Sequence, residues 1–131
     1  MFIDASVIVA ILAEEPDAKT FEARINRAKK LFVSPIAIYE AALGLTRAAD
    51  IKLEDARAAI DRFIVEIQAE IISVDGTIGA HALLAFSRFG KGRSPAKLNM
   101  GDCFAYACAK QLGVPLLFKG DDFSKTDIEV A

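Results

Sequence analysis

Short apolar runs alternate with longer amphipathic segments along the whole chain. Four of these runs are short and apolar enough to predict strands: MFID (1–4), LFVS (31–34), EIISV (70–74) and VPLLF (114–118). IEV (128–130) is a candidate for a fifth strand. Because short buried strands that alternate with helices pair in parallel through right-handed crossovers, the pattern predicts a three-layer α/β fold with a mostly parallel sheet.

The segments between the strands have the apolar spacing of helices. They are ASVIVAILAEE (5–15), PDAKTFEARINRAKK (16–30), PIAIYEAALGLTRAAD (35–50), LEDARAAIDRFIVEIQA (53–69), DGTIGAHALLAFSRFG (75–90) and MGDCFAYACAKQLG (100–113). Their predicted boundary residues are Ser34, Asp75 and Asn99 as N-caps, Pro16 and Pro35 in first turns, and Gly113 at a C-terminus.

The composition is that of a globular protein with only a local capacity for nucleic acid. The length of 131 residues predicts one domain over 1–131, and 53% hydrophobic residues argue against disorder. A net charge of −2 excludes a broad nucleic-acid-binding surface, which is usually basic. The first apolar run has no basic leader and is too short to cross a membrane, so we expect a cytoplasmic protein without membrane association.

The two cysteines and the single histidine do not predict a site of their own. Cys103 and Cys108 fall on different faces of one predicted helix, which disfavours a disulfide, and together with His81 they are too few for zinc. We interpret His81 as a structural histidine, Cys103 as a packed thiol and Tyr106 as a core ring. Unpaired thiols also favour a reducing compartment.

Acidic residues stand where parallel α/β sheets bind ligands, beyond the carboxyl ends of their strands. Asp4 follows the first predicted strand, and Asp121 and Asp122 follow the fourth. Asp102 lies in the first turn of its helix, where a carboxylate can either bind a ligand or cap the helix and interact with its dipole. The sequence leaves both roles open for Asp102.

Glu40 is the most informative acid because its helix face is otherwise apolar. The segment 35–45 contains no other charge, and Glu40 shares a face with Ile36 and Leu43. A carboxylate in such a place needs a cation such as Arg47, an exposed edge position or a shared site. If these acids do converge, their repulsion is best relieved by a hard divalent cation with oxygen ligands, Mg²⁺ or Mn²⁺.

A basic loop stands directly before Asp102. Residues 76–101 contain four cations, Arg88, Lys91, Arg93 and Lys97, and no acid. Beside an acidic metal pocket these cations would attract a phosphate backbone that the pocket alone would repel. Glycines at 90, 92 and 101 would allow close backbone approach or positive φ. The alternative is a solvated loop whose charges serve only solubility.

Four motifs in this order resemble a PIN domain, specifically the VapC-type ribonuclease toxins of bacterial toxin–antitoxin pairs: MFIDASVIVAIL, SPIAIYEAALGL, LNMGDCFAYACAK and PLLFKGDDFSKTDI. The resemblance covers residues 1 to about 128. It implies a five-stranded sheet flanked by helices, Mg²⁺- or Mn²⁺-dependent hydrolysis of RNA, a homodimer, and a VapB-type antitoxin that binds the toxin in a heterotetramer or larger complex.

The same resemblance assigns roles to individual residues. Asp4, Glu40 and Asp102 match the catalytic and metal-binding acids, and Ser6 matches the hydroxyl residue that supports the first acid. Asp122 is the preferred fourth acid, with Asp121 as its competitor. Lys119, just before them, either contacts phosphate or neutralises local charge, and we prefer the second interpretation.

Two other functions are compatible with acids at the end of a sheet. A receiver-like phosphoacceptor module also gathers acids and a Lys around Mg²⁺, but it requires a double acid early in the chain, and MFID has one. A PIN-like scaffold that binds a partner without cleavage is disfavoured because every acid that the chemistry requires is present.

Overall fold

The computed structural model describes residues 1–131 and has a parallel sheet at its centre. Each strand is two residues long, and the order across the sheet is β3-β2-β1-β4. The bounds are β1 Phe2–Ile3, β2 Phe32–Val33, β3 Glu70–Ile71 and β4 Leu116–Leu117. All three pairings are parallel, so the predicted α/β class is confirmed.

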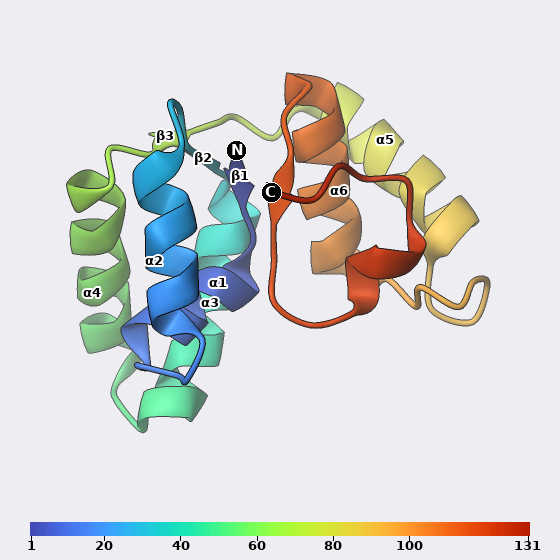
Figure 1. Ribbon diagram of the computed structural model, residues 1–131. Coiled ribbons are helices and arrows are strands. Elements are labelled where there is room, and N and C mark those ends of the chain that lie inside the picture. Colours follow the sequence, from blue (N-terminus) through green and yellow to red (C-terminus); the bar gives the residue numbers. More distant parts are fainter.

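Helices cover the sheet on two sides, as Figure 1 shows. Alternate residues of each strand point to opposite faces of a sheet. The core under α1–α4 therefore contains Ile3, Val33 and Leu117. The core under α5 and α6 contains Phe2, Phe32 and Leu116. The helices are α1 Ala5–Leu12, α2 Ala18–Arg27, α3 Pro35–Ala49, α4 Leu53–Glu66, α5 Gly76–Phe89 and α6 Met100–Leu112, followed by the 3₁₀ helix η1 Asp122–Lys125.

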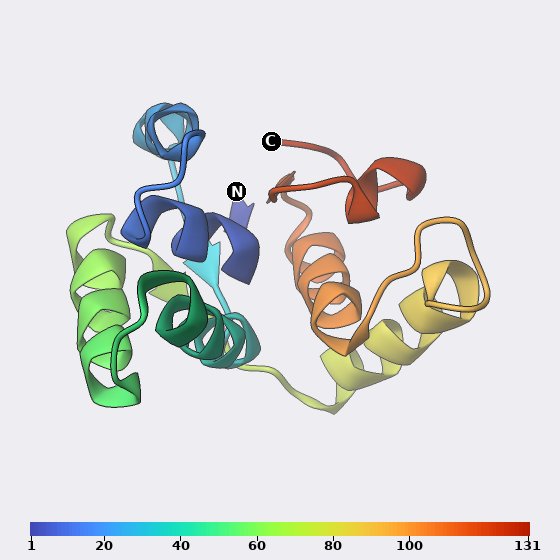
Figure 2. The same ribbon diagram turned by 90° about the horizontal axis from the view of Figure 1, so that it is seen from below.

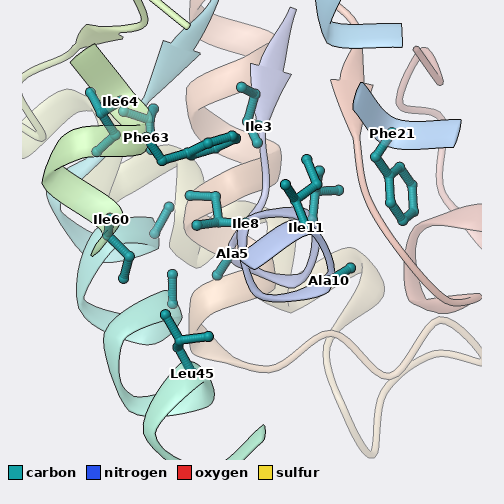
Figure 3. Packing of buried hydrophobic residues seen from close by; sticks show 14 of the residues in the cluster. Ile3, Ala5, Ile8, Ala10, Ile11, Phe21, Leu45, Ile60, Phe63 and Ile64 are labelled. Atoms are coloured by element: carbon teal, nitrogen blue, oxygen red, sulfur yellow. The ribbon is translucent and has the colours of Figure 1, made fainter. Parts of the chain in front are cut away.

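The first core forms around α1. Figure 3 shows Ile60 and Phe63 of α4 pointing toward Ile8 of α1, with Leu45 of α3 beneath them. Ile8, Leu45 and Ile60 are each no more than 1% exposed. This packing fixes α1 and α3 relative to each other, and with them the positions of the acids that they carry.

The expected fifth strand is wrong, because the segment 128–130 makes only one bridge. Val130 pairs with Leu116 in parallel, through hydrogen bonds from Leu116 N to Glu129 O (2.8 Å) and from Ala131 N to Leu116 O (3.0 Å). Before that bridge the chain turns, since Ile128 N donates to the Thr126 hydroxyl. The sheet therefore has four strands and a single additional pairing.

Three further details differ from the sequence-based expectations. The first helix ends at Leu12, because Glu14 adopts a positive φ of 54° and the chain turns there. Pro16 does not open the next helix, which begins at Ala18 after the N-cap Asp17. The third strand, β3, is exposed rather than buried, as an edge strand can be.

The other predicted helix boundaries are confirmed by their hydrogen bonds. Ser34 Oγ accepts from Ala37 N (3.1 Å), Asp75 Oδ1 from Ile78 N (2.9 Å) and Asn99 Oδ1 from Asp102 N (2.9 Å). Gly113 ends α6 with a left-handed φ of 64°, which favours glycine. None of the helices has an apolar stretch that could cross a membrane.

Helices α1, α3 and α6 meet near the carboxyl ends of the strands, the end seen in Figure 2. Helix α3 packs closely on α1 because residue 44 is glycine. A Cβ at Gly44 would lie 2.9 Å from Cγ2 of Val9, closer than real Cβ contacts. This close approach holds α1, which Asp4 caps, against α3, which carries Glu40.

Candidate functional site

Asp4 is the most buried acid of the protein. It directly follows β1, caps α1 and is 6% exposed. Its Oδ2 accepts hydrogen bonds from Ser6 N (3.0 Å) and Ser6 Oγ (2.5 Å), and Ser6 Oγ accepts one from Lys119 N (3.0 Å). These hydrogen bonds hold the carboxylate in a fixed orientation.

Asp102 caps its helix, one of the two roles that the sequence left open, and also lines the acidic pocket. Its Oδ2 accepts from Asn99 N (3.0 Å) while Asn99 caps the helix in return, which forms a capping box at the start of α6. Its half-buried side chain also lines the pocket that contains Asp4. The capping bond orients this carboxylate as Ser6 orients Asp4.

Glu40 reaches the same pocket from α3. It is half-buried and forms no ion pair, so the alternative of a salt bridge with Arg47 is wrong. Its carboxylate lies against the α-carbon of Gly101 in the first turn of α6, where a side chain would overlap it. Glu40 therefore spans the junction between α3 and α6.

The pocket has a volume of about 340 Å³. Most of its lining residues are not hydrophobic, unlike those of the two largest grooves. The lining residues are Asp4, Ala5, Ser6, Val9, Glu15, Glu40, Gly44, Asp102 and Lys119. Three of the acids expected from the sequence thus share one hollow, and Glu15 is an acid there that was not anticipated.

Burial and mutual repulsion raise the pKa values of these acids. Burial raises the pKa of Glu40 from 4.5 to about 7, and the charges of Asp4 and Asp102 add to the effect. Burial also raises the pKa of Asp102 to about 6, against the hydrogen bond from Asn99 and with the charges of Asp4 and Asp122. The pKa of Asp4 is raised by burial, although its hydrogen bonds from Ser6 oppose this.

Asp122 and Asp121 differ in their relation to the pocket. Both are exposed, and Asp122 begins η1. The charge of Asp122 acts on both Asp4 and Asp102, whereas Asp121 has no such effect on either. The backbone oxygen of Asp121 instead accepts hydrogen bonds from the hydroxyl and the backbone N–H of Ser124. The acidic field at the pocket therefore includes Asp122.

Lys119 is held at the edge of the pocket by two acids. Its ammonium pairs with Glu15, and with Asp17 at 3.1 Å. These bonds raise the pKa of Lys119 and tie the turn between α1 and α2 to the segment after β4. Lys119 does neutralise local charge, as expected. The charge that it neutralises is that of Glu15 and Asp17, not that of the predicted acids. Sequence reasoning missed Glu15 because its partner is 104 residues away.

The basic loop is a closed structure. Lys91 N donates to Leu98 O and Leu98 N donates to Phe89 O, both at 2.9 Å, and Gly92 takes a positive φ of 82°. Arg88 pairs with Asp127 at 3.6 Å. The other three predicted cations, Lys91, Arg93 and Lys97, are exposed and form no ion pair. They are the part of the basic cluster that is available to a ligand.

The residues that were interpreted as structural lie outside the acidic pocket. Tyr106 is buried and its hydroxyl donates to Asp127 at 2.5 Å. Cys103 is buried, and burial raises its pKa to about 11, so its thiol is not a nucleophile. His81 lines a separate depression with Arg88 and Lys110.

The donor set of the pocket suits a hard cation. Asp4, Glu40, Asp102 and Asp122 form no ion pair with any Lys or Arg, so their charge is uncompensated. No three acidic, His or Cys side chains already form a complete cage for one ion. The donors themselves, carboxylate oxygens without a paired cation, are of the hard type that Mg²⁺ and Mn²⁺ prefer.

Comparison with known proteins places this arrangement in context. The family model of the PIN domain matches residues 1–129. A VapC ribonuclease of Rhizobium meliloti is 45% identical over 139 residues, covering 97% of this chain and 98% of the relative. Ribonuclease VapC30 of Mycobacterium tuberculosis is 38% identical, covering 98% and 95%, and VapC42 of that organism is 33% identical, covering 100% and 98%.

The raised pKa of Glu40 predicts how stability depends on pH in the metal-free protein. An acid whose folded pKa is raised favours folding at low pH, and this contribution is lost as pH rises from about 4.5 toward about 7. We expect Glu40→Gln to raise the free energy of unfolding at pH 8 by on the order of 1 kcal/mol, after allowance for solvent screening, and by less at pH 5. Urea unfolding at both pH values measures this.

Glu22→Gln is the matched control, since Glu22 is an exposed carboxylate of α2 outside the pocket. It should change the free energy of unfolding by less than about 0.5 kcal/mol at both pH values. Equal effects of the two substitutions would show that Glu40 is not destabilised by its neighbours.

Proposed function

This chain belongs to the PIN domain family and, within it, to the VapC ribonucleases, and on that premise we propose that it is a metal-dependent endoribonuclease toxin. The reaction is hydrolysis of RNA phosphodiester bonds by a water molecule. The observation that carries the proposal is the shared pocket of Asp4, Glu40 and Asp102, whose carboxylates have no protein cation to balance them.

The proposed cofactor is Mg²⁺ or Mn²⁺. Such an ion, when bound, lowers the pKa of a water ligand and stabilises negative charge on the phosphate. Asp4, Asp102 and Asp122 would hold it, since their charges act on one another and two of them have fixed orientations. Asp122 is preferred to Asp121 for the same electrostatic reason.

Glu40 and the basic loop have separate proposed roles. Glu40 acts as a further ligand or as the base that orients the attacking water, because it lines the same pocket as Asp4 and Asp102 and the charges of both act on it. Arg88, Lys91, Arg93 and Lys97 attract the RNA backbone, and the last three supply most of this attraction because Arg88 is paired with Asp127.

The two alternative functions have less support. A receiver-like module has no use for Glu40, and the Lys of such a site would face the acids, whereas Lys119 pairs with Glu15 and Asp17. A scaffold without catalysis has no need of a pocket that concentrates uncompensated carboxylates.

We also propose that the protein forms a homodimer and binds a VapB-type antitoxin, in the cytoplasm. Two apolar grooves support partner binding, because exposed apolar surface of this kind marks protein interfaces. The α3–α4 groove, about 710 Å³, is lined by Pro35, Ile38, Tyr39, Ala42, Leu43, Leu53, Glu54, Arg57 and Ile71. The α5–α6 groove, about 700 Å³, is lined by Gly76, Gly79, Ala80, Ala82, Leu83, Phe86, Met100, Cys103 and Phe104.

Removing either oriented carboxylate should abolish cleavage without unfolding the protein. We expect Asp4→Asn and Asp102→Asn each to lower kcat/KM for a model RNA on the order of a thousandfold, because each loses several kcal/mol of charge stabilisation. Asn is also a good N-cap, so α1 should persist in Asp4→Asn. Cleavage assays in Mg²⁺, with circular dichroism as the folding check, measure this.

Asp55→Asn is the control, since Asp55 is exposed on α4 outside the pocket. It should leave kcat/KM unchanged, and a chelator should stop both the control and the parent. Retained cleavage by a doubly substituted Asp4→Asn, Asp102→Asn protein would overturn the assignment of the active site.

Neutralising the free cations of the loop should weaken RNA binding but not the chemical step. In Lys91→Gln, Arg93→Gln, Lys97→Gln we expect KM to rise, kcat to stay within about twofold, and the slope of log affinity against log salt to become shallower by about 2. The physical reason is that each Lys or Arg that contacts a phosphate releases counterions when RNA binds, so a variant with fewer contacts releases fewer counterions. Steady-state kinetics and binding to a non-cleaved RNA at several salt concentrations measure this.

The control for this variant has the same net charge. Lys19→Gln, Arg27→Gln, Lys29→Gln removes three exposed cations in and just after α2 and should leave the salt slope unchanged. If both triple variants have the same effect, net charge rather than the loop accounts for RNA attraction.

A homodimer should have about twice the monomer mass of 14.1 kDa. A buried Glu without a partner is unfavourable, so Leu53→Glu or Leu83→Glu should dissociate the dimer, according to which groove holds the second copy. Val65→Glu, at a site that is 74% exposed and outside both grooves, should not. Sedimentation velocity measures the mass, and a parent that remains monomeric at micromolar concentration would contradict the dimer.

A further inference from the structure

The Glu40 carboxylate can occupy its observed position only because residue 101 has no side chain. A Cβ built on Gly101 would lie 2.0 Å from Glu40 Oε2, 2.2 Å from Oε1 and 2.2 Å from Cδ. Real Cβ atoms do not approach heavy atoms below 3.0 Å. The whole carboxylate of Glu40 therefore occupies the space that any other residue at 101 would fill.

Backbone conformation does not explain this glycine. Gly101 lies in the first turn of α6 and has no positive φ, unlike Gly92, Gly113 and Gly120. Alanine is a better helix former than glycine, so the local backbone gives no reason for glycine here. Gly76 provides the contrast, because it stands in the first turn of α5 and an added Cβ there would meet nothing within 4 Å.

The two helices cannot separate easily to admit a methyl group at 101. On α3, Ala41 and Leu45 are at most 1% exposed, and Gly44 already lies against Val9 of α1. On α6, Ala107 and Cys108 are fully buried in the second core. The carboxylate of Glu40, at the end of a flexible side chain, is the group that would move.

We propose that Gly101 is a positioning residue that forms the notch in which the Glu40 carboxylate is held beside Asp102. Since Asp102 follows Gly101 directly, the notch sets the spacing between an acid of α3 and an acid of α6. A methyl group there turns Glu40 out of the pocket and leaves the fold in place. The consequence for metal binding and cleavage rests on the proposed function, whereas the seating of Glu40 does not.

The test is a double-mutant cycle of Gly101→Ala and Glu40→Ala, with Thr77→Ala as the control, since Thr77 is exposed in the first turn of α5 and lines neither the acidic pocket nor either apolar groove. Mn²⁺ affinity, measured by calorimetry without RNA, and kcat for RNA cleavage should each fall about 10–100-fold in Gly101→Ala and in Glu40→Ala. The doubly substituted protein should be no worse than Glu40→Ala, because Gly101 acts through Glu40. Thr77→Ala should match the parent in both measurements.

Two results would overturn the proposal. One is a double variant whose loss equals the product of the two single losses, since Gly101 would then act independently of Glu40. The other is a Gly101→Ala protein that binds Mn²⁺ and cleaves RNA as the parent does while Glu40→Ala does not.

A crystal structure of Gly101→Ala separates this inference from the proposed function. We expect Glu40 to be turned away from Asp102, with the α3 and α6 backbones unchanged. If Glu40 instead keeps its position and α6 shifts to admit the methyl group, the proposal that Gly101 positions Glu40 is refuted. If Glu40→Ala leaves Mn²⁺ affinity and cleavage unchanged, the proposed role of Glu40 fails, and the crystal structure still decides whether Gly101 seats it.

Discussion

The central constraint on this structure is that three carboxylates lie close together and no Lys or Arg is paired with any of them. Asp4, Glu40 and Asp102 lie in one small pocket, and the charges of these acids and of Asp122 raise the pKa values of their neighbours. Such an arrangement is unfavourable in the metal-free protein and persists only because the surrounding packing enforces it. In the proposed function, a bound divalent cation would relieve this repulsion.

The cation that lines this pocket, Lys119, is paired with acids other than Asp4, Glu40 and Asp102. Lys119 stands at the rim but is bound to Glu15 and Asp17, and Arg88 is bound to Asp127. The unpaired cations of the loop are Lys91, Arg93 and Lys97. A chain with a net charge of −2 can thus present an acidic hollow to an ion and a local basic surface to a phosphate backbone.

Small residues let the elements that carry the acids approach one another. Gly44 admits Val9 of α1 against α3, and Gly101 admits Glu40 against α6. Hydrogen bonds then orient the carboxylates, through Ser6 for Asp4 and through Asn99 for Asp102. Close approach and local hydrogen bonding together give a site whose acids are held before any ion binds.

The sequence by itself determined the features that depend on neighbouring residues. Caps such as Ser34 and Asn99, the left-handed Gly113 and the alternation of strands and helices follow from local hydrogen bonding and apolar spacing, and the motifs around the acids identified the family. Only the tertiary structure decided which distant groups meet. Three contacts show this: the single bridge between Leu116 and Val130, the pairing of Lys119 with Glu15, and the fit of Glu40 against Gly101. Each contact joins two different segments of the chain. No local pattern encodes the space or the partner that one segment offers to the other.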